Sequence, residues 1–325
     1  MRILITGCNG FIGYHLCNRL MSDGFDITGI DNMNDYYDVG LKRHRLMNLF
    51  CKKNKLIFYK VDINDIESLR TIFRVHRFDT VVHLAAQAGV RYSLENPRAY
   101  MDTNVNGFFN ILECCREFNV DRLLFASSSS VYGNSGSYTD EPISLYAATK
   151  KTNELLAYTY SRLYEIKTIG MRFFTVYGEY GRPDMAYWKF TEKIMNNESI
   201  HIYNFGDIYR DFTYIGDIIE GVCKILYADT HFKYKVYDIG SSKSTSVIRF
   251  VQELHRQMIA HGLTTNELKY KYEPMQPGDV YFTCANLREM KNDYDFKPQT
   301  DIETGLGKFV EWFSMFSRKN GTFVC

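Results

Sequence analysis

The stretch TGCNGFIG, residues 6–13, decides the fold because it places closely spaced glycines between an apolar run and a helical pattern. The run at 2–6 predicts a buried strand, and the pattern at 11–24 predicts a helix that ends at a glycine. Glycines let the backbone approach a ligand closely, and a helix start favours an anion, although a ligand-free tight turn also needs glycines. The spacing is a variant of the dinucleotide-binding fingerprint. The residues expected to contact a dinucleotide here are Gly7, Gly10, Phe11, Ile12 and Gly13.

Asp31 ends the next predicted strand, at 25–31, and follows the glycine turn at the distance that dinucleotide-binding folds require. A carboxylate at this point accepts the ribose hydroxyls of NAD and repels the 2'-phosphate of NADP. We therefore expect the cofactor NAD. A helix cap or a turn is the ordinary alternative for an aspartate in this position.

Strand and helix patterns alternate over the first half of the chain. Near-continuous apolar strands between helices predict a parallel sheet covered on both faces, an α/β doubly wound Rossmann fold. After residue 174 the pattern becomes irregular, so we expect a domain at 1–174 and a smaller mixed substrate lobe at 175–325, interleaved with the sheet. The further strands are predicted at 55–62, 79–86, 121–128 and 167–174, and the main helices at 98–118 and 145–164.

Residues after the third and fourth strands are also expected at the cofactor. Asp62 and Ile63 would face the adenine, and Asn104 on the helix at 98–118 is a further expected contact. Small apolar residues after the fourth strand would line the pyrophosphate, with simple packing as the alternative. These residues are Leu84, Ala85 and Ala86.

The composition excludes several classes of partner. The 39 Lys and Arg nearly balance the 38 Asp and Glu, so the chain lacks the positive net charge that would attract nucleic acid or an anionic membrane. No apolar run is long enough to span a bilayer, and the run in MRILITG is too short for a signal peptide. The 8 cysteines form no C-x-x-C pair, which favours reduced thiols in the cytoplasm, and the 8 histidines lack metal-ligand spacing. We expect no metal.

SLYAATKK, residues 144–151, places Tyr146 and Lys150 four positions apart, on one face of the predicted helix. The serines of ASSSSVYG, residues 126–133, precede them at the carboxyl end of a strand, which borders the ligand crevice of a doubly wound sheet. A nearby ammonium and a positive nicotinamide would lower the pKa of the Tyr146 phenol and make it a usable base. A surface tyrosine and lysine are the alternative interpretation.

With these motifs the chain resembles the extended short-chain dehydrogenase/reductases that act on nucleotide sugars, from TGCNGFIG through HLAAQAGVRYS (83–93) to QPGDV (276–280). Within that family it is similar to UDP-glucuronate 4-epimerases, through the segments at 31–42, 175–186 and 202–217. The resemblance implies that Ser128, Tyr146 and Lys150 are the catalytic residues.

The resemblance implies an isomerase, a homodimer and a UDP-sugar substrate. The expected reaction interconverts UDP-glucuronate and UDP-galacturonate through a 4-keto intermediate. Related dehydratases carry an Asp-Glu pair after the catalytic serine or threonine, whereas this chain has Ser129 and Ser130, which cannot eliminate water in that way. The alternatives are a UDP-glucose or UDP-N-acetylglucosamine 4-epimerase, a UDP-glucuronate decarboxylase, and an NAD-sensing regulatory module, although such modules typically lose the Tyr-Lys pair.

The expected substrate contacts extend into the second half of the chain. A guanidinium binds a carboxylate with two parallel hydrogen bonds, so Arg182 is the candidate for the sugar carboxylate, with help from Thr175. Arg210 is expected on the diphosphate, with an ion pair to Asp211 or Asp217 as the alternative. The remaining expected substrate contacts are Arg91, Ser128, Ser129, Ser130, Tyr203 and Asp279.

Two further expectations concern surfaces. The segment at 133–145 borders the predicted sugar pocket and is several residues shorter than in glucuronate epimerases. The helices at 98–118 and 145–164 would pair across a two-fold axis in a homodimer. The apolar residues considered for that interface are Phe108, Ile111, Leu112, Leu155, Leu156 and Tyr160.

Overall fold

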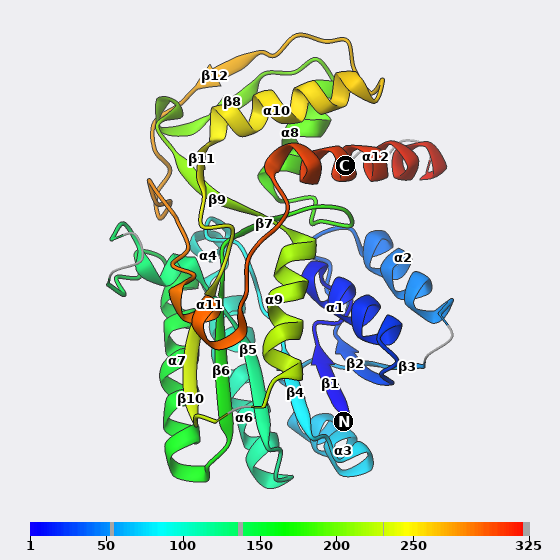
Figure 1. The fold of residues 1–325 in the computed structure, drawn as a ribbon, viewed down its shortest axis with the longest axis vertical. Helices are drawn as coiled ribbons and strands as arrows, with labels where there is room; N and C mark the ends of the chain where they lie inside the picture. Colours follow the sequence, from blue (N-terminus) through cyan, green and yellow to red (C-terminus); the bar gives the residue numbers. More distant parts are fainter. Residues whose placement is uncertain (53–54, 136–138, 230, 321–325) are drawn as a thin grey trace.

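A parallel sheet of seven strands forms the centre of the protein (Figure 1). The structure is a computed structural model that describes residues 1–52, 55–135, 139–229 and 231–320. The strand order is β3-β2-β1-β4-β5-β6-β10, and every neighbouring pair is parallel. This order is that of a doubly wound dinucleotide-binding sheet with one additional strand, so the predicted fold class is confirmed. The strands are β1 (Ile3–Thr6), β2 (Ile27–Asp31), β3 (Leu56–Lys60), β4 (Thr80–His83), β5 (Arg122–Ser128), β6 (Lys167–Phe173) and β10 (Tyr234–Ile239).

Helices cover both faces of the sheet (Figure 1), because the strands are apolar on both sides. On one face, α1 (Phe11–Ser22) packs between α2 (Val39–Phe50) and α9 (Ile215–Tyr227). On the other face, α6 packs between α3 and α7. These three helices are α3 (Ile66–His76), α6 (Phe108–Glu117) and α7 (Leu145–Tyr164).

The second half of the chain builds a smaller lobe beyond the carboxyl ends of the strands, at the top of Figure 1. Two small sheets and three main helices form it, while α9 and β10 return from this half of the chain to the large sheet. The strands are β7 (Thr175–Tyr177), β8 (Ile200–Ile202), β9 (Tyr209–Tyr214), β11 (Ser244–Ser246) and β12 (Tyr270–Tyr272). The three helices are α8 (Ala186–Met195), α10 (Val247–Ala260) and α12 (Ile302–Asn320), with a 3-10 turn, η3, at Tyr203–Gly206, while the short α11 (Arg288–Tyr294) packs against β10 and α9.

The helix predicted at 98–118 is composed of different helical types. It begins as α5 (Pro97–Tyr100), continues as a π-helix, η1 (Met101–Gly107), and only then becomes α6. Two short helices also lie beyond the carboxyl ends of the strands: α4 (Tyr92–Glu95) and the 3-10 helix η2 (Ser129–Tyr132). π-helical turns inside α-helices frequently lie at functional sites, and the hydrophobic pattern did not predict this one.

Within the described residues, none of the helices combines the length and the apolar character needed to cross a membrane.

Candidate functional site

A cavity of about 1230 Å³ lies between the carboxyl edge of the large sheet and the small lobe. Residues from both halves of the chain line it. Among them are nearly all the predicted site residues: Gly7, Gly10, Phe11, Ile12, Gly13, Asp31, Ile63, Leu84, Ala85, Ala86, Arg91, Ser128, Ser129, Ser130, Tyr146, Lys150, Thr175, Arg182, Tyr203, Arg210 and Asp279.

Two predicted cofactor residues lie behind the cavity wall. Asp62 accepts hydrogen bonds from the side chain of Asn32 at 2.8 Å and from the backbone N–H of Asn64 at 2.9 Å. Asn104, on the π-helix, is buried and holds the backbone of Gln87 by accepting from its N–H at 2.8 Å and donating to its carbonyl at 3.0 Å. Both residues therefore support cavity-lining neighbours, Asn32 and Gln87.

The glycine turn after β1 has separate structural and ligand-binding requirements. Gly7 has φ +68°, and a Cβ on it would lie 2.8 Å from the backbone nitrogen of Ala85. A Cβ on Gly13 would lie 2.1 Å from the Gly7 carbonyl oxygen, so packing alone requires both glycines. Gly10 precedes α1 without a side-chain cap, and the first turn of α1 carries no acidic residue. The N-terminus of α1 is thus open to an anion at the cavity, and the turn fits a diphosphate.

Asp31 is buried at the end of β2 and accepts hydrogen bonds from the backbone N–H groups of Asn9 at 3.1 Å and Met33 at 2.8 Å. A carboxylate has about four acceptor positions, so these two bonds leave room for ribose hydroxyls. Lys42, which the sequence interpretation did not assign, also lines the cavity and donates to Asn34 at 2.6 Å. This edge fits the adenosine ribose of a dinucleotide.

Ser128, Tyr146 and Lys150 meet where β5 ends and α7 begins. Ser128 Oγ accepts from the Ser130 hydroxyl at 2.9 Å, and Lys150 Nζ donates to the Ala126 carbonyl at 2.9 Å. Burial lowers the pKa of Lys150 to about 8. Burial also raises the pKa of Tyr146, while hydrogen bonding to Ser128 and the charge of Arg182 oppose the rise. Ser128 and Arg182 therefore both favour the ionised phenol, against the effect of burial.

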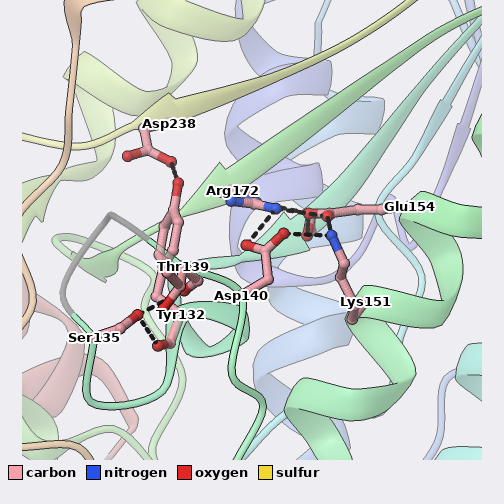
Figure 2. A network of polar contacts seen from close by, with 9 residues as sticks. Tyr132, Ser135, Thr139, Asp140, Lys151, Glu154, Arg172 and Asp238 are labelled. Carbon is pink, nitrogen blue, oxygen red and sulfur yellow. Dashed lines mark hydrogen bonds and ion pairs between the residues drawn. The ribbon is translucent and has the colours of Figure 1, made fainter.

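A polar network behind these residues joins α7 to the sheet (Figure 2). Glu154 on α7 accepts from Ser127 Oγ at 2.6 Å and pairs with Arg172 on β6. Asp140, in the segment before α7, adds ion pairs to Lys151 at 2.5 Å and to Arg172 at 2.9 Å. These contacts hold the strand that carries the serines against the helix that carries Tyr146.

The short segment at 133–145 reaches the cavity through its end. Ser144 caps α7 by accepting from the Ala147 N–H at 3.2 Å, and it lines the cavity. At the other end of the segment, a Cβ on Gly133 would lie 2.0 Å from the Glu141 carbonyl oxygen, so the segment folds closely on itself. Residues 136–138 lie outside the described part of the chain.

Arg182 is already paired. Its Nε donates to Asp184 Oδ1 at 2.9 Å and its Nη2 to Asp184 Oδ2 at 2.5 Å. Tyr36 donates to the same carboxylate at 3.3 Å, and Thr175 begins β7 at the cavity wall. The sequence singled out Arg182 but not Asp184, although the acid is only two positions away.

The opposite end of the cavity brings Arg91, Tyr203, Arg210 and Asp279 together. Arg91 pairs with Asp279 at 2.8 Å and lies over the Tyr203 ring, 4.3 Å from its centroid. Arg210 makes no ion pair with any residue that the structure describes, and burial lowers its pKa to about 10. The charge of Asp279 offsets this effect only in part, and a desolvated cation without an ion pair favours an anionic ligand.

The alternative partners that the sequence offered for Arg210 are occupied elsewhere. The Asp211 carboxylate accepts from Ser241, Ser242 and Ala285, and the Asp217 carboxylate accepts from the backbone of Gln299 and Thr300. Both acids therefore stabilise the lobe and leave Arg210 to the cavity.

Several cavity residues were missed. Gln87 is buried, and its side-chain Nε2 has no hydrogen-bond partner among the described residues. It follows the predicted strand at 79–86 directly, and the rule that ligands bind beyond the carboxyl ends of strands would have found it. Other missed cavity residues are Tyr36, Asp184, Lys189 and Lys193.

Comparison with known proteins agrees with this geometry. The family model described as GDP-mannose 4,6 dehydratase matches residues 4–309. Protein CapI of Staphylococcus aureus is 44% identical, over 98% of this chain and 100% of that protein. UDP-glucuronate 4-epimerase 4 of Arabidopsis thaliana is 42% identical, over 96% of this chain and 75% of that protein.

Among solved structures, UDP-glucuronic acid 4-epimerase from Bacillus cereus, in complex with UDP-glucuronic acid and NAD, superposes with a TM-score of 0.89. It is 28% identical, and the superposition covers 97% of this chain and 100% of that chain. These matches confirm the resemblance described from the motifs. The chain belongs to the GDP-mannose 4,6 dehydratase family of extended short-chain dehydrogenase/reductases, whose members act on nucleotide sugars.

Proposed function

We propose that this chain is a NAD-dependent 4-epimerase that interconverts UDP-glucuronate and UDP-galacturonate through a 4-keto intermediate. The observation that carries the proposal is one cavity that joins the glycine turn, Ser128, Tyr146, Lys150 and Arg182. Similarity to the UDP-glucuronate 4-epimerases of Arabidopsis thaliana and Bacillus cereus supports it.

NAD fits the open N-terminus of α1 and the Asp31 carboxylate, which would repel a 2'-phosphate. The chemistry that bound NAD would supply is reversible hydride transfer at the sugar C4, so turnover would consume no external oxidant. Structural neighbours crystallised with NAD support this assignment.

Tyr146 is the proposed base for the 4-hydroxyl of the sugar, and it releases and regains one proton in each turnover. Ser128 accepts from the Ser130 hydroxyl and is hydrogen-bonded to Tyr146, so its hydroxyl lies beside the proposed base, where it can hold the reacting oxygen. Lys150 is fixed on the Ala126 carbonyl and provides a buried positive charge on the same face of α7. Ser129 and Ser130 provide no carboxylic acid for water elimination, which disfavours a dehydratase.

The two ends of the cavity suit the two ends of the substrate. Arg210, which makes no ion pair with a described residue, suits the UDP diphosphate, and Arg91, Tyr203 and Asp279 suit the ribose and uracil. Arg182 and Thr175 suit the sugar carboxylate at the other end. A guanidinium that holds this carboxylate near the carbonyl plane also opposes decarboxylation of the 4-keto uronate.

The test is product analysis after separate incubation of the protein with UDP-glucuronate, UDP-glucose and UDP-N-acetylglucosamine. UDP-galacturonate from the first sugar is the expected product. A UDP-pentose as the main product would identify a decarboxylase, and turnover of only a neutral sugar would identify a hexose epimerase. Retained NAD without turnover of any sugar would favour the regulatory module.

We also propose a homodimer, through α7 and the helix that precedes β5. Phe108, Ile111 and Leu112, three of the residues considered for the interface, instead pack fully buried against the chain's own sheet. Exposed apolar side chains on η1, α6 and α7 include Met101 at 41%, Phe109 at 45%, Leu155 at 59% and Leu163 at 64% exposure. Light scattering at micromolar concentration is expected to give twice the chain mass, and a Leu155→Lys variant half of that.

We further propose a cytoplasmic location. Within the described part of the chain no two cysteines form a disulfide with each other, which suits a reducing compartment.

A further inference from the structure

Asp184 occupies only one edge of the Arg182 guanidinium. Its two oxygens accept from Nε and Nη2, which lie on the same side of the group. A guanidinium has five N–H donors, so the edge formed by Nη1 and the second Nη2 hydrogen remains available for another carboxylate. The Arg182 side chain retains 19% of its surface exposed and lines the cavity.

Neighbouring side chains hold this pair in place. Tyr36 donates its hydroxyl to Asp184 Oδ2 at 3.3 Å, and its ring lies 5.9 Å from the Arg182 guanidinium. Gly89 leaves space for that hydroxyl, because a Cβ there would lie 2.8 Å from it. Arg182 therefore has a fixed plane although arginine is a flexible side chain.

The pair remains ionised in the cavity wall. Burial disfavours the Asp184 charge, but the Arg182 charge and hydrogen bonds bring its pKa below the ordinary value. The charge of Lys189, another cavity residue, acts on Asp184 in the same direction. The Asp184 carboxylate thus compensates the charge of Arg182 before a substrate binds. Selection of a sugar with a carboxylate over a neutral sugar therefore depends on the orientation of the guanidinium and not on its charge alone.

We propose that Asp184 is a positioning residue, which fixes the plane of Arg182 so that its outer edge holds the uronate carboxylate near the plane of the C4 carbonyl. The proposal deepens the proposed function and rests on it. In this arrangement the substrate carboxylate binds beside Asp184 and does not displace it. The consequence is faithful epimerisation with little loss of carbon dioxide.

The experiment compares Asp184→Asn with the wild-type protein on UDP-glucuronate and UDP-glucose. The variant leaves Arg182 less fixed but more positive, so UDP-glucuronate is expected to bind as tightly or more tightly in calorimetry. Its kcat is expected to fall roughly 10–100-fold, the effect of a misplaced reacting group, and the share of UDP-pentose to rise. UDP-glucose binding and turnover are expected to stay within about twofold, because no carboxylate meets Arg182.

Glu198→Gln is the matched control, since it removes the same charge from an exposed position beyond α8. If Asp184→Asn does not fold, Tyr36→Phe removes only the hydroxyl donated to Asp184, and a smaller rise in UDP-pentose is expected. Equal losses on both sugars, or weaker binding of both, would overturn the proposal. If the wild-type protein binds UDP-glucuronate without epimerising it, the proposed function fails. Calorimetry then decides on Asp184 alone, because a change confined to UDP-glucuronate supports it and an equal change on both sugars refutes it.

Discussion

Glu154 on α7 pairs with Arg172 on β6 through both carboxylate oxygens, with Nε–Oε1 and Nη2–Oε2 distances of 2.7 Å each. Glu154 lies two helical turns after Tyr146 and also accepts from Ser127, the neighbour of Ser128. Glu154 therefore connects the helix that carries the proposed base to β6 through Arg172 (Figure 2) and to the strand that carries the proposed serine through Ser127.

Replacement of Arg172 by Met is expected to reduce the free energy of unfolding by about 3–5 kcal/mol, because it leaves the buried Glu154 carboxylate without its main partner. Urea denaturation measures this loss. A double variant, Arg172→Met with Glu154→Leu, removes both charges and is expected to recover much of the stability while losing turnover. A double variant less stable than Arg172→Met would show that the pair is not the main contact.

Tyr146→Phe is expected to abolish epimerisation while UDP-sugar and NAD binding persist. Phenylalanine keeps the ring but cannot take a proton, and loss of general-base catalysis alone lowers the rate roughly 10²–10⁴-fold. Steady-state kinetics and calorimetry on the same preparation measure both effects. Turnover near the wild-type rate would assign the base to another group.

Lys150→Met tests the buried ammonium through its pH dependence. The folded pKa of Lys150, about 8, lies below the ordinary 10.5, so below pH 8 the native state carries a disfavoured charge. At pH 7 the free energy of unfolding of the variant is expected to exceed that of the wild-type protein by roughly 2–3 kcal/mol. The variant is also expected to be inactive. As pH rises from 8 to 10.5 the native lysine loses its proton first, and the stability of the wild-type protein approaches that of the variant.

Thermal unfolding of both proteins at several pH values, after removal of bound nucleotide, measures that difference. A constant gap between pH 7 and pH 10 would contradict the lowered pKa.

Arg210→Met is expected to weaken UDP binding by about 2–5 kcal/mol and to leave uridine binding nearly unchanged, because only the diphosphate loses its counter-charge. Calorimetry with UDP and uridine provides the comparison, and Arg249, an exposed residue on α10, provides a control as Arg249→Met. Equal losses for the two ligands would place Arg210 at the nucleoside or in the fold.

The sequence determined the sheet, its helices and the positions of the proposed catalytic residues. The alternation of apolar strands and helices is visible in the local periodicity and specifies the layers. Tyr146 and Lys150 share a helix face because they are four residues apart. The turn after β1 was equally predictable, because only glycine allows the contacts of Gly7 and Gly13. The helix faces and the contact of Gly13 with Gly7 depend on neighbours close in the chain, whereas the contact of Gly7 with Ala85 forms only in the folded sheet.

The tertiary structure alone decided which charges are paired and which surfaces are covered. Tyr36 lies against the Arg182–Asp184 pair, Arg210 makes no ion pair with a described residue, and Phe108 faces the sheet while Phe109 faces outward. Asn104 lies on the π-helix and accepts from the N–H of Gln87, and the hydrophobic pattern of the sequence predicts neither feature. These outcomes depend on contacts between segments far apart in the chain, such as Tyr36 with Asp184, and burial then makes the difference between a paired and an unpaired charge large in free energy.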